Sequence, residues 1–241
     1  HSGGRHIPVY RAVNLIPFGF LPDGRRIFSR LPNSSTRFDP RFNNILMAES
    51  AGVSRYDALT LQLTGRFSRG LQFSVNYTLS KAVDDAPEQN LAGIPQGLVL
   101  SDTFNRRLDQ GNSLADQRHA FSLSLVAQPK FNLNDKLLRY LFNHNQLGLI
   151  ATANSGERFN ITADFDLNQD GVFGAGITNS DRPVGIRRNS GQTPPQYNVD
   201  LRWSRFFNFS ARYRLEVFGE FTNLFNTNCI VQYNNVTVTT N

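Results

Sequence analysis

The stretch best suited to chemistry is a run of acidic and amide residues at positions 164–171, Asp-Phe-Asp-Leu-Asn-Gln-Asp-Gly. From Asp166 onward it fits the pattern D-x-[DN]-x-[DN]-G, the first half of a calcium loop. Oxygen ligands at alternate positions of a turn point inward at one hard cation, and the glycine permits the sharp bend. The spacing therefore predicts a Ca²⁺ site. Its predicted ligands are Asp164, Asp166, Asn168, Asp170 and Asp181.

The predicted site differs from an EF-hand, because position twelve of the loop is Ile177 where an EF-hand carries glutamate. We expect weak binding, with a dissociation constant of roughly 0.1–1 mM, as in extracellular calcium modules. The other interpretation is a solvated acidic hairpin loop, and both stay open at this point.

Other polar residues predict little chemistry. The four histidines, at positions 1, 6, 119 and 144, lack metal-ligand spacing. Carboxylates at positions 84, 85, 102 and 109 lie in a predicted loop without a positioned partner, so we expect no enzyme. The pairs 106–107 and 187–188 are arginines that could touch an anionic lipid or substrate, although such pairs in loops are usually solvated. We identify no catalytic residue, and the sequence does not define a binding site for a larger ligand.

The element that organises the chain is a predicted β-hairpin at residues 55–82. Odd positions of 59–67 and 71–79 are almost all apolar, whereas even positions are Thr, Gln, Ser, Asn and Arg. Strict alternation on both sides of Ser68-Arg69-Gly70 predicts two antiparallel strands with one apolar face. Each arm is about as long as a tilted strand that crosses a bilayer. We therefore expect the odd residues of 59–79 to face apolar surroundings.

Further alternation predicts an all-β fold, an antiparallel meander of about 8–10 long strands forming a partial or complete β-barrel of outer-membrane type. A soluble sandwich is the alternative, but its solvent face usually carries more lysine and glutamate. We expect residues 1–54 to be a loop-rich lead-in with short strands at 7–14 and 25–29. Residues 55–241 form the barrel segment, with long loops at 83–117 and 166–195. Further strands are predicted at 118–128, 146–153, 157–165, 196–206, 212–223 and 229–239, and a short turn at 136–143.

Composition agrees with a barrel wall without requiring one. The chain has 241 residues, of which 39% are hydrophobic, and no apolar run approaches the roughly 20 residues of a membrane helix. Its mean hydropathy is −0.37, and alternation with a polar lumen would dilute that average. The net charge is +6, but the arginines are interleaved with acids, so we expect no nucleic-acid partner.

Residues 54–85, SRYDALTLQLTGRFSRGLQFSVNYTLSKAVDD, resemble a segment of Oar-like TonB-dependent outer-membrane receptors, the type that carries a carboxypeptidase-regulatory-like domain. The likeness continues, in the family's order, at 116–121, 154–159, 181–183 and 218–226. The resemblance implies a C-terminal barrel region, a Gram-negative outer membrane and uptake or binding of a large ligand. A plug is not recognisable in these residues, so the resemblance implies contact with TonB only through a plug outside them.

Two functions are therefore expected from different classes. The first is a part of a receptor barrel, with outer-membrane lipid and the rest of the parent barrel as partners. The second is a processed, extracellular structural β-protein that assembles with copies of itself into a ring or filament. In both, we expect the unpaired edges of the sheet to be covered, so that the chain is never an isolated monomer.

Overall fold

The structure is a computed structural model that describes residues 1–67, 70–85, 100–132, 134–163, 165–171, 181–210, 212–230 and 236–237. Several predictions concern residues outside this set: Ser68 and Arg69 of the hairpin turn, much of the 83–117 loop, Asp164, residues 172–180 and most of the expected last strand. Within the described residues, no helix is long and apolar enough to cross a membrane.

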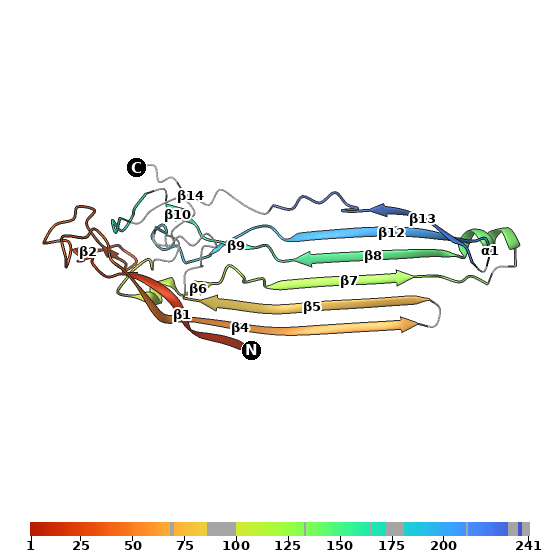
Figure 1. The fold of residues 1–241 in the computed structure, drawn as a ribbon, viewed down its shortest axis with the longest axis horizontal. Helices are drawn as coiled ribbons and strands as arrows, with labels where there is room; N and C mark the ends of the chain where they lie inside the picture. Colours follow the sequence, from red (N-terminus) through yellow and green to blue (C-terminus); the bar gives the residue numbers. More distant parts are fainter. Residues whose placement is uncertain are drawn as a thin grey trace.

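One antiparallel sheet forms the body of the molecule, as the alternation predicted (Figure 1). Its strands follow the order β1-β4-β5-β7-β8-β12-β13, and the short β6 pairs with the end of β5. The sheet stays open, with β1 and β13 at its edges. The bounds are β1 Ser2–Ala12, β4 Leu46–Phe67, β5 Leu71–Asp84, β6 Gly111–Asn112, β7 His119–Ala127, β8 Asn145–Asn154, β12 Gln196–Asn208 and β13 Arg214–Phe221.

The central hairpin pairs β4 with β5 from Ser54↔Asp84 to Phe67↔Leu71. Gly65 faces Phe73 across the two strands. A Cβ at position 65 would collide with the Phe73 ring, so glycine there lets the ring lie over the backbone. Gly70 has φ +80, a left-handed conformation that glycine adopts without strain, and this lets the chain reverse into β5.

The lead-in differs from its prediction in three respects. β1 has eleven residues instead of a short piece at 7–14, and it pairs with the first half of β4 from Ser2↔Tyr56 to Ala12↔Leu46. β4 itself has 22 residues and runs across the expected boundary between residues 54 and 55. The other expected piece, 25–29, contains only the two-residue β3 Arg26–Ile27, which pairs with β2 Gly19–Phe20.

Two further predictions of local structure were wrong. Residues 136–143 contain a helix, α1 Lys136–Phe142, instead of a turn, because the Asp135 side chain caps the amide groups of Leu137 and Leu138. Residues 157–165 do not add a strand to the main sheet; they hold the short β9 Arg158–Phe159 and β10 Thr162–Ala163. β9 pairs with β11 Gly191–Gln192, and β10 with β14 Val236–Thr237, the only described strand of the expected 229–239.

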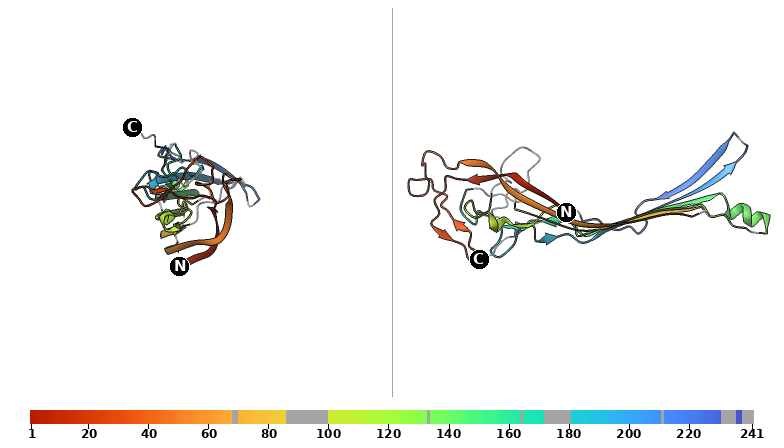
Figure 2. Two further views of the ribbon diagram at one scale, coloured as in Figure 1. Left: turned by 90° about the vertical axis from the view of Figure 1, so that its left-hand side faces the viewer. Right: turned by 90° about the horizontal axis from the view of Figure 1, so that it is seen from below.

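The molecule is elongated and its two ends differ (Figures 1 and 2). At one end, the turn end, lie the end of β4, the start of β5, α1 and the described residues between β12 and β13. At the other, the loop end, the long connections gather. Between them the sheet is a single layer, and leucines 59, 61 and 63 of β4 are each about 60% exposed. The described apolar core, with Ala12, Leu15 and Phe28, sits at the loop end.

Candidate functional site: the two-faced wall and the loop cluster

The register of the sheet gives it two chemically different faces. Along one row Leu63 pairs with Val75, Val75 with Leu123, Leu123 with Ala151 and Ala151 with Val199. The adjacent row joins glutamine, asparagine, serine and threonine, at positions 62, 76, 122, 152 and 198. Since directly paired residues point to the same side, odd positions of six strands share one face and even positions the other. The face of odd residues is mostly apolar, whereas the face of even residues is mostly small and polar.

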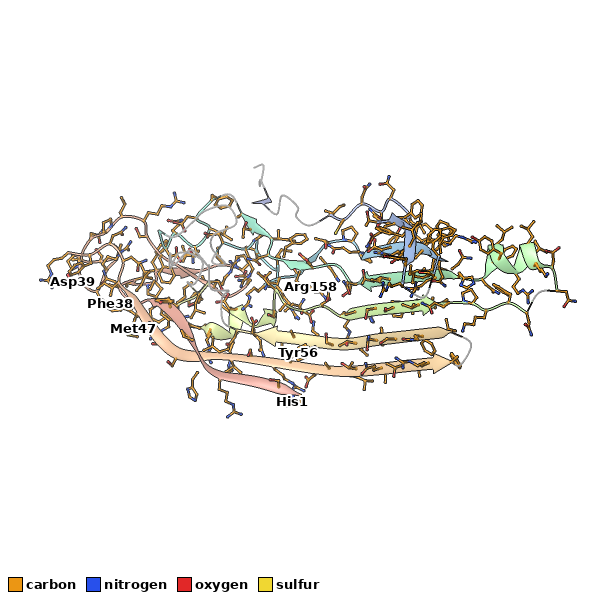
Figure 3. The ribbon with its side chains drawn as sticks, turned by 45° about the vertical axis from the view of Figure 1, so that its right-hand side comes forward. His1, Phe38, Asp39, Met47, Tyr56 and Arg158 are labelled. Atoms are coloured by element: carbon orange, nitrogen blue, oxygen red, sulfur yellow. The ribbon has the colours of Figure 1, made fainter. Side chains whose placement is uncertain are left out.

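The loop cluster comprises the described parts of residues 13–45, 100–118 and 155–195, which meet at the loop end (Figure 1). Figure 3 shows its extent, with Phe38 and Asp39 at the far tip and Arg158 where the strands begin. Unlike the wall, it buries many charged side chains. Isolated buried charges are costly, so each of these must be paired or hydrogen-bonded. The pairs join loops that are far apart in the sequence.

Asp102 ties the second loop to the first. Its carboxylate accepts hydrogen bonds from the backbone of Arg26 at 3.0 Å and from Arg26 Nη1 at 3.1 Å, and its side chain is fully buried. The Arg26 guanidinium also lies 5.0 Å from the centroid of the Phe104 ring. Charge-assisted hydrogen bonds of this kind are about twice as strong as neutral ones. This pair therefore fixes how the two loops pack.

Asp109 ties the second loop to the third. Its Oδ1 accepts a 2.9 Å hydrogen bond from Arg182 Nη1, and its Oδ2 accepts one of 2.8 Å from the Ser101 amide. Arg188 donates from Nη1 to the Asp109 carbonyl at 3.1 Å and forms an ion pair with Asp84 at the end of β5. The third loop is thus held both to the second loop and to the wall.

Asp116 fastens the base of the cluster to the wall. It accepts a 2.8 Å hydrogen bond from the Ala82 amide and forms ion pairs with Lys81 at 3.0 Å and Arg158 at 3.2 Å. Burial would raise the pKa of Asp116, but the Ala82 hydrogen bond and the two cations outweigh it. The pKa therefore lies below its ordinary value.

The structure brings four of the five predicted calcium ligands into the cluster, and all four are almost completely buried: Asp166, Asn168, Asp170 and Asp181. The fifth, Asp164, lies outside the described residues. Asp166 accepts hydrogen bonds from the amide groups of Asp170 and Gly171, at 3.1 and 3.0 Å, and forms a 3.1 Å ion pair with Arg30. Asp181 accepts a 2.8 Å hydrogen bond from the Leu167 amide.

The loop is therefore a closed turn in which backbone amides and Arg30 already engage the Asp166 carboxylate. Asn168 accepts a 3.1 Å hydrogen bond from the Asp170 amide and donates one of 3.2 Å to the Ser101 carbonyl, which connects the turn to the second loop. Among the described residues, no three His, Cys, Asp or Glu side chains are grouped so that they could hold a metal ion. Calcium binding stays a prediction, and Arg30 would compete with the cation for the Asp166 carboxylate.

The remaining candidate residues are dispersed. His1 lies 2.6 Å from Asp57, and His119 lies 2.8 Å from the Tyr77 hydroxyl. Asp85 pairs with Arg106 at 3.0 Å, which anchors the start of its loop beside β4. Arg107 and Arg187 are exposed, as expected for solvated loop residues.

Buried arginines are the functional feature that sequence reasoning missed. Arg188 was expected to be solvated with Arg187, but its side chain is fully buried against Asp84 and Asp109. Arg25 and Arg37 are also buried. Burial lowers the pKa of Arg37, and the charge of Asp170 opposes this shift. The available signal was the excess of arginine over lysine, because the planar guanidinium suits buried, multiply hydrogen-bonded sites.

A one-layer antiparallel sheet with an apolar face, a polar face and ordered loops at one end is the wall of a membrane β-barrel. Residues 2–187 match the family described as an outer membrane beta barrel domain, and the chain belongs to this family. The outer membrane is therefore its location. No curated protein and no solved structure matches the chain.

Proposed function

We propose that this chain forms part of the wall and the external loops of a TonB-dependent outer-membrane receptor that binds or takes up a large ligand. The sequence resemblance at residues 54–85 supports the receptor class. The observation that carries the proposal is the uncovered polar face of the wall.

Toward the turn end, the polar face has no packing partner within the described residues. Thr60, Gln62 and Thr64 of β4 are exposed, although they lie on the side of the sheet that a barrel encloses. In a barrel of eight strands, side chains from opposite walls fill the interior, whereas wider barrels hold a channel or a plugged lumen. The open edges at β1 and β13 also require further strands, because unpaired backbone groups cannot face hydrocarbon. Both features suit a large receptor barrel.

The loop cluster supplies a surface suited to ligand contact. Large apolar side chains are exposed on its first loop, although the charged groups beneath them are buried and paired. The most exposed of them are Phe18, Phe20, Leu31, Phe38 and Phe42. Exposed apolar groups on a firmly held scaffold are typical of binding surfaces.

The test measures the mass of the native polypeptide and asks whether it contacts TonB. Antibodies against the 100–118 loop are used to detect it in outer-membrane fractions of the host. A receptor with about 22 strands and a plug has a mass of about 100 kDa, whereas the free chain has 27.1 kDa. The larger species is then incubated with the periplasmic domain of the host TonB. We expect a band near the larger mass that cross-links to TonB.

A native species of 27.1 kDa would instead favour the self-assembling structural protein, since the two open edges would then have to pair between copies. A large species that does not cross-link to TonB would still be a membrane barrel, but it would contradict the assignment as a TonB-dependent receptor.

A further inference from the structure

Among the described residues, the apolar side of α1 at the turn end is contacted by one aromatic side chain, since the Phe142 ring meets the Phe131 ring edge-on with 6.2 Å between centroids. At about 100° per residue, Leu137, Leu141, Leu138 and Phe142 fall on one side of the helix, while Lys136, Arg139 and Tyr140 fall on the other. The four apolar side chains are between 44% and 67% exposed. This is the pattern of a helix that lies in a membrane interface.

The helix is held firmly despite its uncovered side. The Asp135 side chain caps its first turn, accepting from Leu137 N at 2.7 Å. At its other end Asn143 exchanges hydrogen bonds with the backbone of Phe131, at 2.7 and 3.2 Å. The apolar side is therefore presented in a fixed orientation, and its exposure follows from how α1 is anchored.

Arg205 joins the helix to the lipid-facing side of the wall. Position 205 belongs to the row of odd residues on β12, where it pairs with Asn145 and Val217. Its guanidinium donates to the carbonyls of Tyr140 and Leu141, at 2.8 and 2.7 Å, and lies 5.1 Å from the Tyr140 ring centroid. The last turn of α1 thus adjoins the apolar outer face of the barrel.

The turn end is also the positive end of the chain. The described residues of 66–72, 128–147 and 205–214 contain seven Lys or Arg and one carboxylate, Asp135, so they carry as much positive charge as the net +6 of the whole chain. Two of the three lysines, Lys130 and Lys136, lie here. The β12–β13 turn adds two exposed aromatic residues, Phe209 and Tyr213. Aromatic side chains mark the interfaces of outer-membrane barrels, and clustered cations attract anionic lipid.

We infer that α1 and the cations around it form a docking surface for anionic phospholipid headgroups of the periplasmic leaflet. The short turns of such barrels lie on the periplasmic side, which selects this leaflet. The apolar side of α1 enters the acyl boundary, and Lys136 and Arg139 contact the phosphates. Arg205 keeps the helix against the wall.

The test uses the whole native polypeptide in a variant whose only cysteine is the one introduced by Leu138→Cys. A polarity-sensitive fluorophore is attached to this cysteine. It is reconstituted into vesicles of phosphatidylcholine and phosphatidylglycerol in equal parts, with a spin label on one lipid or the other. We expect stronger quenching by labelled phosphatidylglycerol. In K136Q/R139Q this preference should weaken markedly, since each cation near an anionic surface is worth roughly fivefold. R107Q/R187Q, which removes two exposed arginines of the loop end, should keep it.

A second variant, L137A/L141A, keeps helix-forming residues and removes apolar area, so quenching by both lipids should fall. Three results would overturn the inference. Equal quenching by the two lipids would exclude headgroup recognition. Quenching by aqueous iodide alone would place α1 in water. Protection of the fluorophore from the spin-labelled lipids and from iodide would show that another part of the parent protein covers the helix. None of these results depends on TonB, so they are separable from a failure of the receptor assignment.

Discussion

The guanidinium of Arg182 and the carboxylate of Asp109 form a 2.9 Å ion pair between two loops, with side chains that are 3% and 0% exposed. The residues are 73 positions apart in the sequence. Asp109 also accepts hydrogen bonds from the amide and the hydroxyl of Ser101. Because the pair is so deeply buried, the loss of either partner would leave a charge without its counterion.

We predict that R182M loosens the loop cluster. Leaving the Asp109 carboxylate buried without Arg182 costs about 3–5 kcal/mol. Hydrogen exchange of the Ser101 amide in the reconstituted protein measures this cost, as a lower free energy of opening. R187Q, at an exposed arginine of the same loop, should change it by no more than about 0.5 kcal/mol. Equal protection in R182M and the unaltered protein would contradict the prediction.

Acid should weaken the attachment of the cluster to the wall. The folded pKa of Asp116 lies below its ordinary value, chiefly because the hydrogen bond from Ala82 and the cations Lys81 and Arg158 outweigh the effect of burial. The resulting stability is present above the unfolded pKa of about 3.9 and is lost as the pH falls through the folded value.

The measurement is exchange of the Ala82 amide as a function of pH. D116N should open more readily at neutral pH and lose the acid-dependent part of the profile. A D116N profile that keeps the same acid dependence would assign it to another carboxylate.

Neighbouring wall residues should differ in their surroundings. Spin labels at Leu61 and Gln62 lie on opposite faces, because the register keeps odd and even positions apart across six strands. We expect Leu61 to be accessible to oxygen in the lipid and Gln62 to a water-soluble nickel complex. Labels at Leu123 and Ser124, two strands away, should repeat the pattern. If labels at Leu61 and Gln62 were equally accessible to oxygen and to the nickel complex, the assignment of the two faces would be wrong.

Calcium binding by the acidic loop is tested by calorimetry with millimolar calcium. If Asp166 and Asp170 bind the ion, D166A and D170A should each abolish the heat of binding, with a dissociation constant of roughly 0.1–1 mM in the unaltered protein. R30Q should strengthen binding, since the Arg30 side chain forms an ion pair with Asp166 at 3.1 Å. Absence of any heat that depends on these carboxylates would show that the buried turn binds no calcium.

The open edges predict that the isolated chain associates. β1 and β13 each have one unpaired side in the described sheet, and such edges template pairing with other strands. Light scattering of the 241-residue chain in water should therefore show oligomers or aggregates. A stable, monodisperse particle of 27.1 kDa without detergent would refute this.

The sequence by itself determined the strands of the wall and their two faces. Alternation is a local property, so residues 59–67 and 71–79 indicate both strand and orientation without knowledge of any partner. The length of β4 was missed, because residues 46–54 alternate poorly and owe their strand conformation to pairing with β1. The helix α1 was mistaken for a turn, although its Asp135 cap was a local signal.

Only the tertiary structure decided which loop residues meet. Asp166, Asn168 and Asp170 lie together because they are close in the chain, but Arg30 beside Asp166 comes from 136 positions away. The same holds for Arg26 with Asp102 and for Arg188 with Asp84. Buried ion pairs join residues through the packing of whole loops. That packing depends on where the paired strands place the ends of each loop. A local sequence pattern does not contain this information.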